Sequence, residues 1–103
     1  MGKNIQVSVK DGAVIIAIKA NQFVYAETYN ELNEVYSMNE VTSAASITVE
    51  LNEVDMIDSS GLAMLLKMRD TLGQKTTIKI NGADPQIKEV LAISGCERLF
   101  QIS

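Results

Sequence analysis

Alternating apolar and polar residues open the chain and give way to a longer apolar run. Residues 5–9 alternate strictly, which is typical of a strand with one buried face. Asp11-Gly12 follows and favours a tight hairpin turn. The run AVIIAIKA at 13–20 predicts a second strand, and its near-continuous apolar character indicates burial on both faces. The first strand is therefore expected at an antiparallel edge of a sheet, with the second strand inside it.

Beyond residue 20 the pattern changes to apolar residues spaced three and four apart, with short apolar runs between. This spacing is typical of helices that bury one face. Helices are predicted over residues 25–38, 59–73 and 81–95, and strands over residues 46–51 and 76–80. Asp84 is expected to cap the last helix, with Pro85 in its first turn and Gly95 at its end. Residues 96–102 predict a short helical turn and an apolar tail.

The resulting order is β-β-α-β-α-β-α, which belongs to the α/β class. Strands that alternate with helices imply parallel pairing through right-handed crossovers. We expect a four-stranded mixed β-sheet backed by three to four helices. A chain of 103 residues is long enough for one domain and too short for two, so residues 1–103 are expected to form a single domain.

Charge and composition narrow the classes of function. The net charge of −4 and the absence of a basic run argue against nucleic acid as a partner. The longest apolar stretch, Ala13–Ile18, is far too short to span a membrane, and the first residues, MGKNIQ, lack the apolar core expected of a signal peptide. The single cysteine, Cys96, is expected to be buried and fits a reducing compartment. These features predict a cytoplasmic protein that contacts no membrane.

The segment Asp58-Ser59-Ser60-Gly61 joins an apolar run to the second predicted helix and has two interpretations. In the structural one, Asp58 or Ser59 caps the helix, and Gly61 lets the loop pack closely. In the functional one, a serine at the helix start carries a phosphate, which the exposed amides and the helix dipole stabilise. That phosphate would add about −1.5 to −2 charges close to existing carboxylates and expel an acidic or apolar partner.

Catalysis is a poorer explanation for the same serines. The chain has no histidine, which is the commonest general base and metal ligand, and the G-x-S-x-G motif is absent. A serine–lysine pair with Lys67 or Lys88 is conceivable, but no spacing brings an amine to the hydroxyl. The sequence therefore predicts a protein that is not an enzyme and holds no metal.

Around this segment the sequence resembles the STAS domains, the fold of bacterial anti-sigma factor antagonists. The stretch LNEVDMIDSSGLAMLLKMRDTLG at 51–73 resembles the family signature. VIIAIKA at 14–20 resembles the second strand of the family, and residues 83–102 resemble its last helix and tail. The resemblance covers nearly the whole chain.

The resemblance implies a function for each residue of the segment. Ser59 corresponds to the serine that a kinase phosphorylates in the antagonists, where the same kinase is also an anti-sigma factor of the histidine-kinase-like ATPase type. Asp58 is then expected to shape the loop and cap the helix, Ser60 to hydrogen-bond the loop or accept phosphate secondarily, and Gly61 to leave the hydroxyl accessible. A PP2C-type phosphatase would remove the phosphate. ATP belongs to the kinase, so the resemblance implies no cofactor and a monomer when free.

One segment departs from the family pattern. Antagonists usually carry a Gly-Glu-Leu/Val-Asp run after the second strand, whereas this chain has Ala20-Asn21-Gln22-Phe23 and lacks both acidic residues. The candidate partner interface comprises Asn21, Gln22, Phe23, Met56, Met64 and Met68. Phe23 and the last two methionines have a second interpretation as core residues. At 100° per residue, the side expected to pack on the sheet carries Leu62, Leu65, Leu66 and Leu72.

Three functions follow from these observations. The first is a phosphorylation-controlled module that sequesters the kinase and anti-sigma factor in a partner switch. The second is a STAS subunit, switched or constitutive, that controls a non-sigma effector such as polysaccharide or biofilm machinery, a stress-signalling complex or a lipid-transport accessory. The third is a site for a small ligand such as a nucleotide at the loops around Ser59, although no base-stacking or ribose motif supports it.

Overall fold

The computed structural model describes residues 4–73 and 75–103, so residues 1–3 and 74 of the predicted domain lie outside it. In chain order the elements are β1 (Ile5–Lys10), β2 (Ala13–Ile18), β3 (Gln22–Phe23), α1 (Tyr25–Tyr36), α2 (Asn39–Thr42), β4 (Ser46–Glu50), β5 (Met56–Ile57), α3 (Ser59–Leu72), β6 (Thr77–Asn81), α4 (Pro85–Ile93), the 3₁₀ turn η1 (Cys96–Arg98) and β7 (Gln101–Ile102). All four predicted strands and all three predicted helices are present. The predicted short helical turn is present as η1, and the other additional elements are two to four residues long, too short to leave a periodic pattern.

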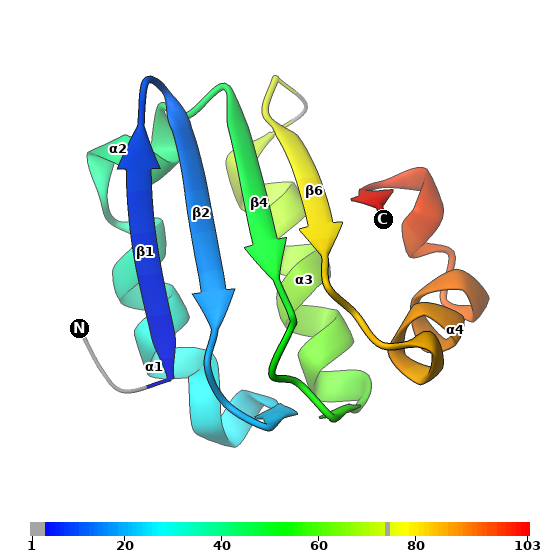
Figure 1. The fold of residues 1–103 in the computed structure, drawn as a ribbon. Coiled ribbons are helices and arrows are strands. Elements are labelled where there is room, and N and C mark those ends of the chain that lie inside the picture. Colours follow the sequence, from blue (N-terminus) through cyan, green and yellow to red (C-terminus); the bar gives the residue numbers. More distant parts are fainter. Residues whose placement is uncertain (1–3, 74) are drawn as a thin grey trace.

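The main sheet has five strands rather than the four predicted, in the order β1-β2-β4-β6-β7, because the last residues of the chain add the short strand β7 beside β6. β1 pairs with β2 antiparallel, while β2, β4, β6 and β7 run parallel to one another (Figure 1). The prediction of an antiparallel edge strand beside an internal one is therefore confirmed. The connecting turn has φ of 52° at Asp11 and 80° at Gly12, as a two-residue hairpin with matching twist requires.

One face of the sheet is covered by α1 and α3, which lie behind the strands in Figure 1. On this face, six buried side chains of the three central strands lie in register, those of Val14, Ile16, Ile47, Val49, Ile78 and Ile80. The prediction that β2 is buried on both faces holds only at Ala17 and is wrong for the rest of its second face. Ile15, which points to the other face, is 39% exposed, because in the described part of the chain neither α1 nor α3 reaches that side.

The inward face of α3 carries three of the four predicted leucines, since Leu65 is buried and Leu62 and Leu72 pack partly buried against the core, but Leu66 does not lie there. Its buried residues are Gly61, Met64, Leu65 and Met68, spaced as one helical face. Leu66 is 42% exposed, while Lys67 lies in solvent as expected. Gly61 determines this rotation because it lies against the backbone of β3 and so directs its own side of the helix inward. Hydrophobicity alone favours the leucines, and it carries no information about that contact.

The C-terminal region follows its predicted signals closely. The backbone N–H of Ile87 donates to Asp84 Oδ1 at 2.9 Å, and Pro85 occupies the first turn of α4. Gly95 follows the helix with φ of 79°. Cys96 is buried, and that burial raises the pKa of its thiol.

The carboxyl ends of the parallel strands all meet at one end of the molecule. The chain leaves β2 for β3 there and leaves β4 for β5, and these two short strands pair in parallel to form a small second sheet. Figure 1 shows α1 and α3 both beginning at this end. Such an end, where loops follow parallel strands, is where α/β proteins generally place their functional residues. Of the helices described, none has the length and hydropathy needed to cross a bilayer.

Candidate functional site

Asp58 is the N-cap of α3, which settles the choice between Asp58 and Ser59. Its Oδ1 accepts a hydrogen bond from the backbone N–H of Gly61 at 3.0 Å and another from the hydroxyl of Ser60 at 2.6 Å. The Ser60 hydroxyl and then the Gly61 amide hold the pKa of the Asp58 carboxyl below its ordinary value, since both donate to the charged form. The structural interpretation of the 58–61 segment is thus correct for Asp58.

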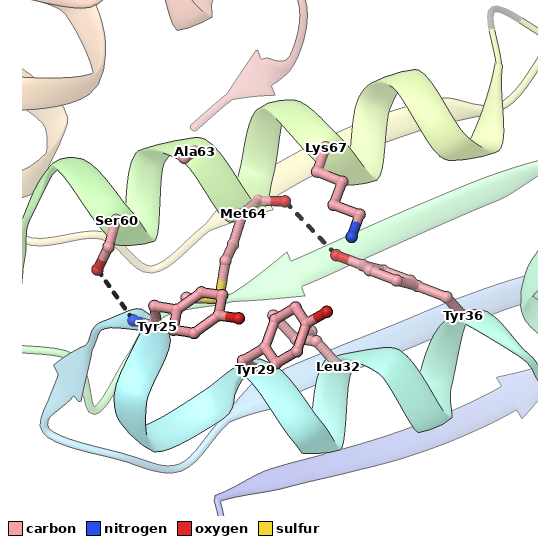
Figure 2. Close-up of a pocket in the computed structure, with 8 residues that line it drawn as sticks. All are labelled: Tyr25, Tyr29, Leu32, Tyr36, Ser60, Ala63, Met64 and Lys67. Carbon is pink, nitrogen blue, oxygen red and sulfur yellow. Dashed lines mark hydrogen bonds between the residues drawn. The ribbon is translucent and has the colours of Figure 1, made fainter.

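Ser60 joins the starts of two helices. While its hydroxyl donates to Asp58, its oxygen accepts a hydrogen bond from the backbone N–H of Tyr25 at 2.9 Å (Figure 2). Tyr25 is the first residue of α1, and the residue before it, Val24, makes no side-chain cap. Ser60 therefore caps α1 from a neighbouring helix, satisfying an amide that would otherwise lack a partner.

Gly61 is required by a close backbone approach. A Cβ built at this position would lie 2.1 Å from the carbonyl oxygen of Phe23 and 2.8 Å from Cγ1 of Ile57. Real Cβ atoms do not approach backbone oxygens so closely, and the contact joins β3 and β5 to the first turn of α3. The expectation that Gly61 lets the loop pack closely is correct.

Ser59 is the exposed serine of the segment. Within residues 4–73 and 75–103, its hydroxyl has no hydrogen-bond partner, whereas that of Ser60 has two. Asp58 and Asp55 are exposed nearby in the chain, and Glu53 forms a surface ion pair with Lys19 at 3.0 Å. The first turn of α3 thus offers one free hydroxyl among carboxylates.

Three of the predicted interface residues lie together beside this turn. Gln22 is opposite Met56 in the β3–β5 pair, and Asn21 accepts hydrogen bonds through its carbonyl from the amides of Asp55 and Met56, at 2.7 and 3.2 Å. The side chains of Asn21 and Gln22 are exposed, and that of Met56 is 39% exposed. A partner that approaches Ser59 would meet this surface.

The other three predicted interface residues are buried. Phe23 and Met68 are 0% exposed and Met64 is 5% exposed, so the prediction that they offer a surface to a partner is wrong. Their second interpretation, as core, is correct. Phe23 points inward because strand residues alternate and its neighbour Gln22 takes the solvent side. The methionines lie on the face of α3 that Gly61 turns toward the sheet.

Replacing Asp58 is expected to lower stability in a pH-dependent way. Near neutral pH, the urea midpoint of unfolding should be highest for wild type, lower for Asp58→Asn and lowest for Asp58→Ala. Asparagine keeps a side-chain acceptor for the cap but lacks the negative charge, and alanine lacks both. The pKa of Asp58 is depressed on folding, so its contribution is complete above the ordinary value of 3.8 and is lost as the pH falls through the folded value. Wild type and Asp58→Asn should therefore converge in stability as the pH falls below the depressed pKa of Asp58 in the folded protein. If the difference in urea midpoint between wild type and Asp58→Asn did not change with pH, the charge of Asp58 would not be what stabilises the helix start.

Comparison with known proteins gives one consistent result. A family model for the STAS domain matches residues 4–103. A STAS-domain containing protein of Pseudomonas aeruginosa (strain UCBPP-PA14) is 33% identical over 76 residues, which cover 73% of this chain and 74% of that protein.

Solved structures with the same fold are more distant in sequence. An anti-sigma-factor antagonist (STAS) domain protein from Planctomyces limnophilus superimposes with a TM-score of 0.80 at 14% identity, covering 95% of this chain and 87% of that one. The anti-sigma factor antagonist SpoIIAA in its unphosphorylated form gives a TM-score of 0.74 at 14% identity, with coverage of 96% and 87%. The phosphorylated form of SpoIIAA from Bacillus gives 0.69 at 15% identity, with coverage of 96% and 90%.

Proposed function

Since this chain belongs to the STAS domain family, we propose that it is a protein-binding module rather than an enzyme, switched by a phosphate on Ser59. The observation that carries the proposal is the contrast between the two serines. Ser59 is exposed and its hydroxyl has no partner in the described part of the chain, whereas Ser60 holds two helix starts together. A kinase can therefore modify Ser59 without disturbing the fold.

The mechanism is electrostatic. The Ser59 oxygen attacks the γ-phosphorus of ATP on the kinase, ADP leaves, and the hydroxyl proton passes to solvent or to the kinase. The product carries about −1.5 to −2 charges at the start of α3, beside Asp58 and Asp55. The helix dipole holds the phosphate in place, while the added charge repels a partner docked on Asn21, Gln22 and Met56.

The partners that fit this mechanism are a serine kinase of the histidine-kinase-like ATPase type, which also acts as an anti-sigma factor, and a PP2C-type phosphatase. The unphosphorylated chain sequesters the kinase in the cytoplasm, and the phosphatase restores that state. SpoIIAA, which has the same fold, has been solved with and without phosphate. The uncharged Asn21 and Gln22 favour, as a second candidate output, a non-sigma effector such as polysaccharide or biofilm machinery.

Peptide mass spectrometry of the protein isolated from its native host tests the switch. We expect a phosphate that maps to Ser59 in a fraction of the molecules and responds to growth conditions. Ser59→Ala should abolish it, and the matched variant Ser60→Ala should leave a phosphate on Ser59. Phosphate found on Ser60 alone would show that Ser59 is not the acceptor. Complete absence of phosphate, with a partner recovered at a fixed ratio, would favour a constitutive subunit.

A further inference from the structure

A groove of about 270 Å³ lies between α1 and α3, and Ser59 is not among the residues that line it. Figure 2 shows its two walls. α1 contributes Tyr25, Tyr29, Leu32 and Tyr36, and α3 contributes Met64 and Lys67, with Ser60 at one end. In the sequence, the three tyrosines indicate only an apolar helical repeat. The fold gathers them on one side of a cavity, which indicates a binding site rather than packing alone.

The α1 wall of the groove is largely aromatic. The rings of Tyr25 and Tyr29 stack with centroids 4.2 Å apart and planes 24° from parallel. Leu32 and Met64 are buried and close the groove from the core side. Tyr36 reaches across from α1 toward the carbonyl of Met64, at 3.5 Å. An apolar body placed here would contact rings and aliphatic groups on several sides.

The polar groups at the Lys67 side of the groove suit an anion. Lys67 Nζ lies 5.5 Å from the centre of the Tyr29 ring. A hydrogen bond with Asn33 and the charge of Lys67 lower the pKa of Tyr29, while burial raises the pKa of Tyr36 to about 12. Within the part of the chain that the structure describes, none of the residues lining the groove is acidic. A chain with a net charge of −4 thus presents a local cation beside phenolic hydroxyl donors.

We propose that this groove binds a small carboxylate with an aromatic or short aliphatic body. The body lies between the tyrosine rings and Met64, and the carboxylate meets the Lys67 ammonium and the hydroxyl of Tyr29. A cationic ligand is disfavoured because Lys67 already occupies the region over the Tyr29 ring. The groove is slightly smaller than the roughly 300–1,000 Å³ of pockets for drug-sized molecules, so its ligand is no larger than about a dozen non-hydrogen atoms.

Titration of the isotopically labelled full chain with three matched probes tests this proposal by NMR. The probes are phenylacetate, its neutral amide and phenethylamine, which share one body and differ in charge. We expect saturable shifts at the amides of Ala63 and Met64 with phenylacetate, with a Kd on the order of millimolar. The amide should bind at least about fivefold more weakly, and the amine more weakly still. No saturable shift, or equal affinity for all three, would overturn the proposal.

Variants distinguish the effect of the Lys67 charge on binding from the effect of the shape of the groove. Lys67→Gln should reduce the affinity for phenylacetate to that for the amide, whereas Lys88→Gln, at an exposed position of α4, should leave it unchanged. Ala63→Leu, at an exposed position of the lining, should block all binding without disturbing the core. If Lys67→Gln bound phenylacetate as strongly as wild type does, the charge of Lys67 would have no role in binding. Ser59→Ala should bind phenylacetate as wild type does. The groove proposal can therefore be wrong while the phosphorylation proposal is right, and the reverse.

Discussion

Gly61→Ala is expected to lower the free energy of unfolding by about 3 kcal/mol, a large fraction of the stability of a domain of this size. The sign of this change is itself informative. In an ordinary helix, replacing glycine by alanine stabilises by about 1 kcal/mol, because alanine loses less backbone entropy on folding. Gly61 lies within α3, so helix propensity predicts that alanine raises the stability, whereas the close contact with Phe23 predicts that it lowers the stability.

The loss of stability arises because there is no space for the added methyl group. It would lie 2.1 Å from the carbonyl oxygen of Phe23, a backbone atom of a residue that is paired with Ile57 across β3 and β5 and so cannot easily move aside. Relief requires α3 to move away from β3, which opens the packing around Phe23. The same displacement would weaken the hydrogen bond between Ser60 and the start of α1.

Urea unfolding of Gly61→Ala beside Gly95→Ala separates the clash from backbone strain. Gly95 has φ of 79°, and a Cβ added there would meet no atom within 4 Å, so alanine introduces strain without a collision. We expect Gly95→Ala to cost about 1 kcal/mol. A Gly61→Ala protein as stable as wild type, or more stable than Gly95→Ala, would show that β3 does not constrain α3.

Ser59→Asp is expected to weaken binding to the cognate kinase at least tenfold, equivalent to about 1.4 kcal/mol, while Ser59→Ala binds within about twofold of wild type. The alanine result follows because the Ser59 hydroxyl makes no hydrogen bond within the described residues, so its removal leaves the fold intact. The aspartate places a negative charge beside Asp58 and Asp55, where the phosphate would lie.

Isothermal titration with the kinase recovered from the native host measures both affinities, and Ser59→Asn is the matched control. Asparagine has nearly the shape of aspartate but no charge, so it should bind more like alanine. Similar weakening by Asn and Asp would mean that bulk rather than charge expels the partner. If neither Ala nor Asp changed the affinity, Ser59 would lie outside the interface.

Features set by neighbouring residues are predictable from the sequence. The hairpin at Asp11-Gly12 and the cap at Asp84 depend on a few consecutive residues, and both form as expected. The four main strands and three helices follow from periodicity, because each buries one face against the others. Asp58 and Ser59 stand out in the sequence for the same reason, since a helix start has a local signature.

Features set by distant contacts are not predictable in this way. Ser60 reaches Tyr25 across 35 positions, and nothing in either neighbourhood indicates that bond. The inward face of α3 depends on where β3 lies, so hydrophobicity wrongly predicts Leu66 inside and does not decide whether Met68 belongs to core or surface. The groove between α1 and α3 requires both helices at once, and its tyrosines therefore resemble an ordinary apolar repeat.

The bond from Tyr25 to Ser60 also provides the molecule with a reporter of its own. The Tyr25 amide proton exchanges with solvent only when that bond opens, and the bond depends on how α3 begins. Its deuterium uptake therefore reports on the 58–61 segment from a position 35 residues earlier in the chain. One resonance in α1 can thus follow the opening of the first turn of α3 without a label attached near that turn.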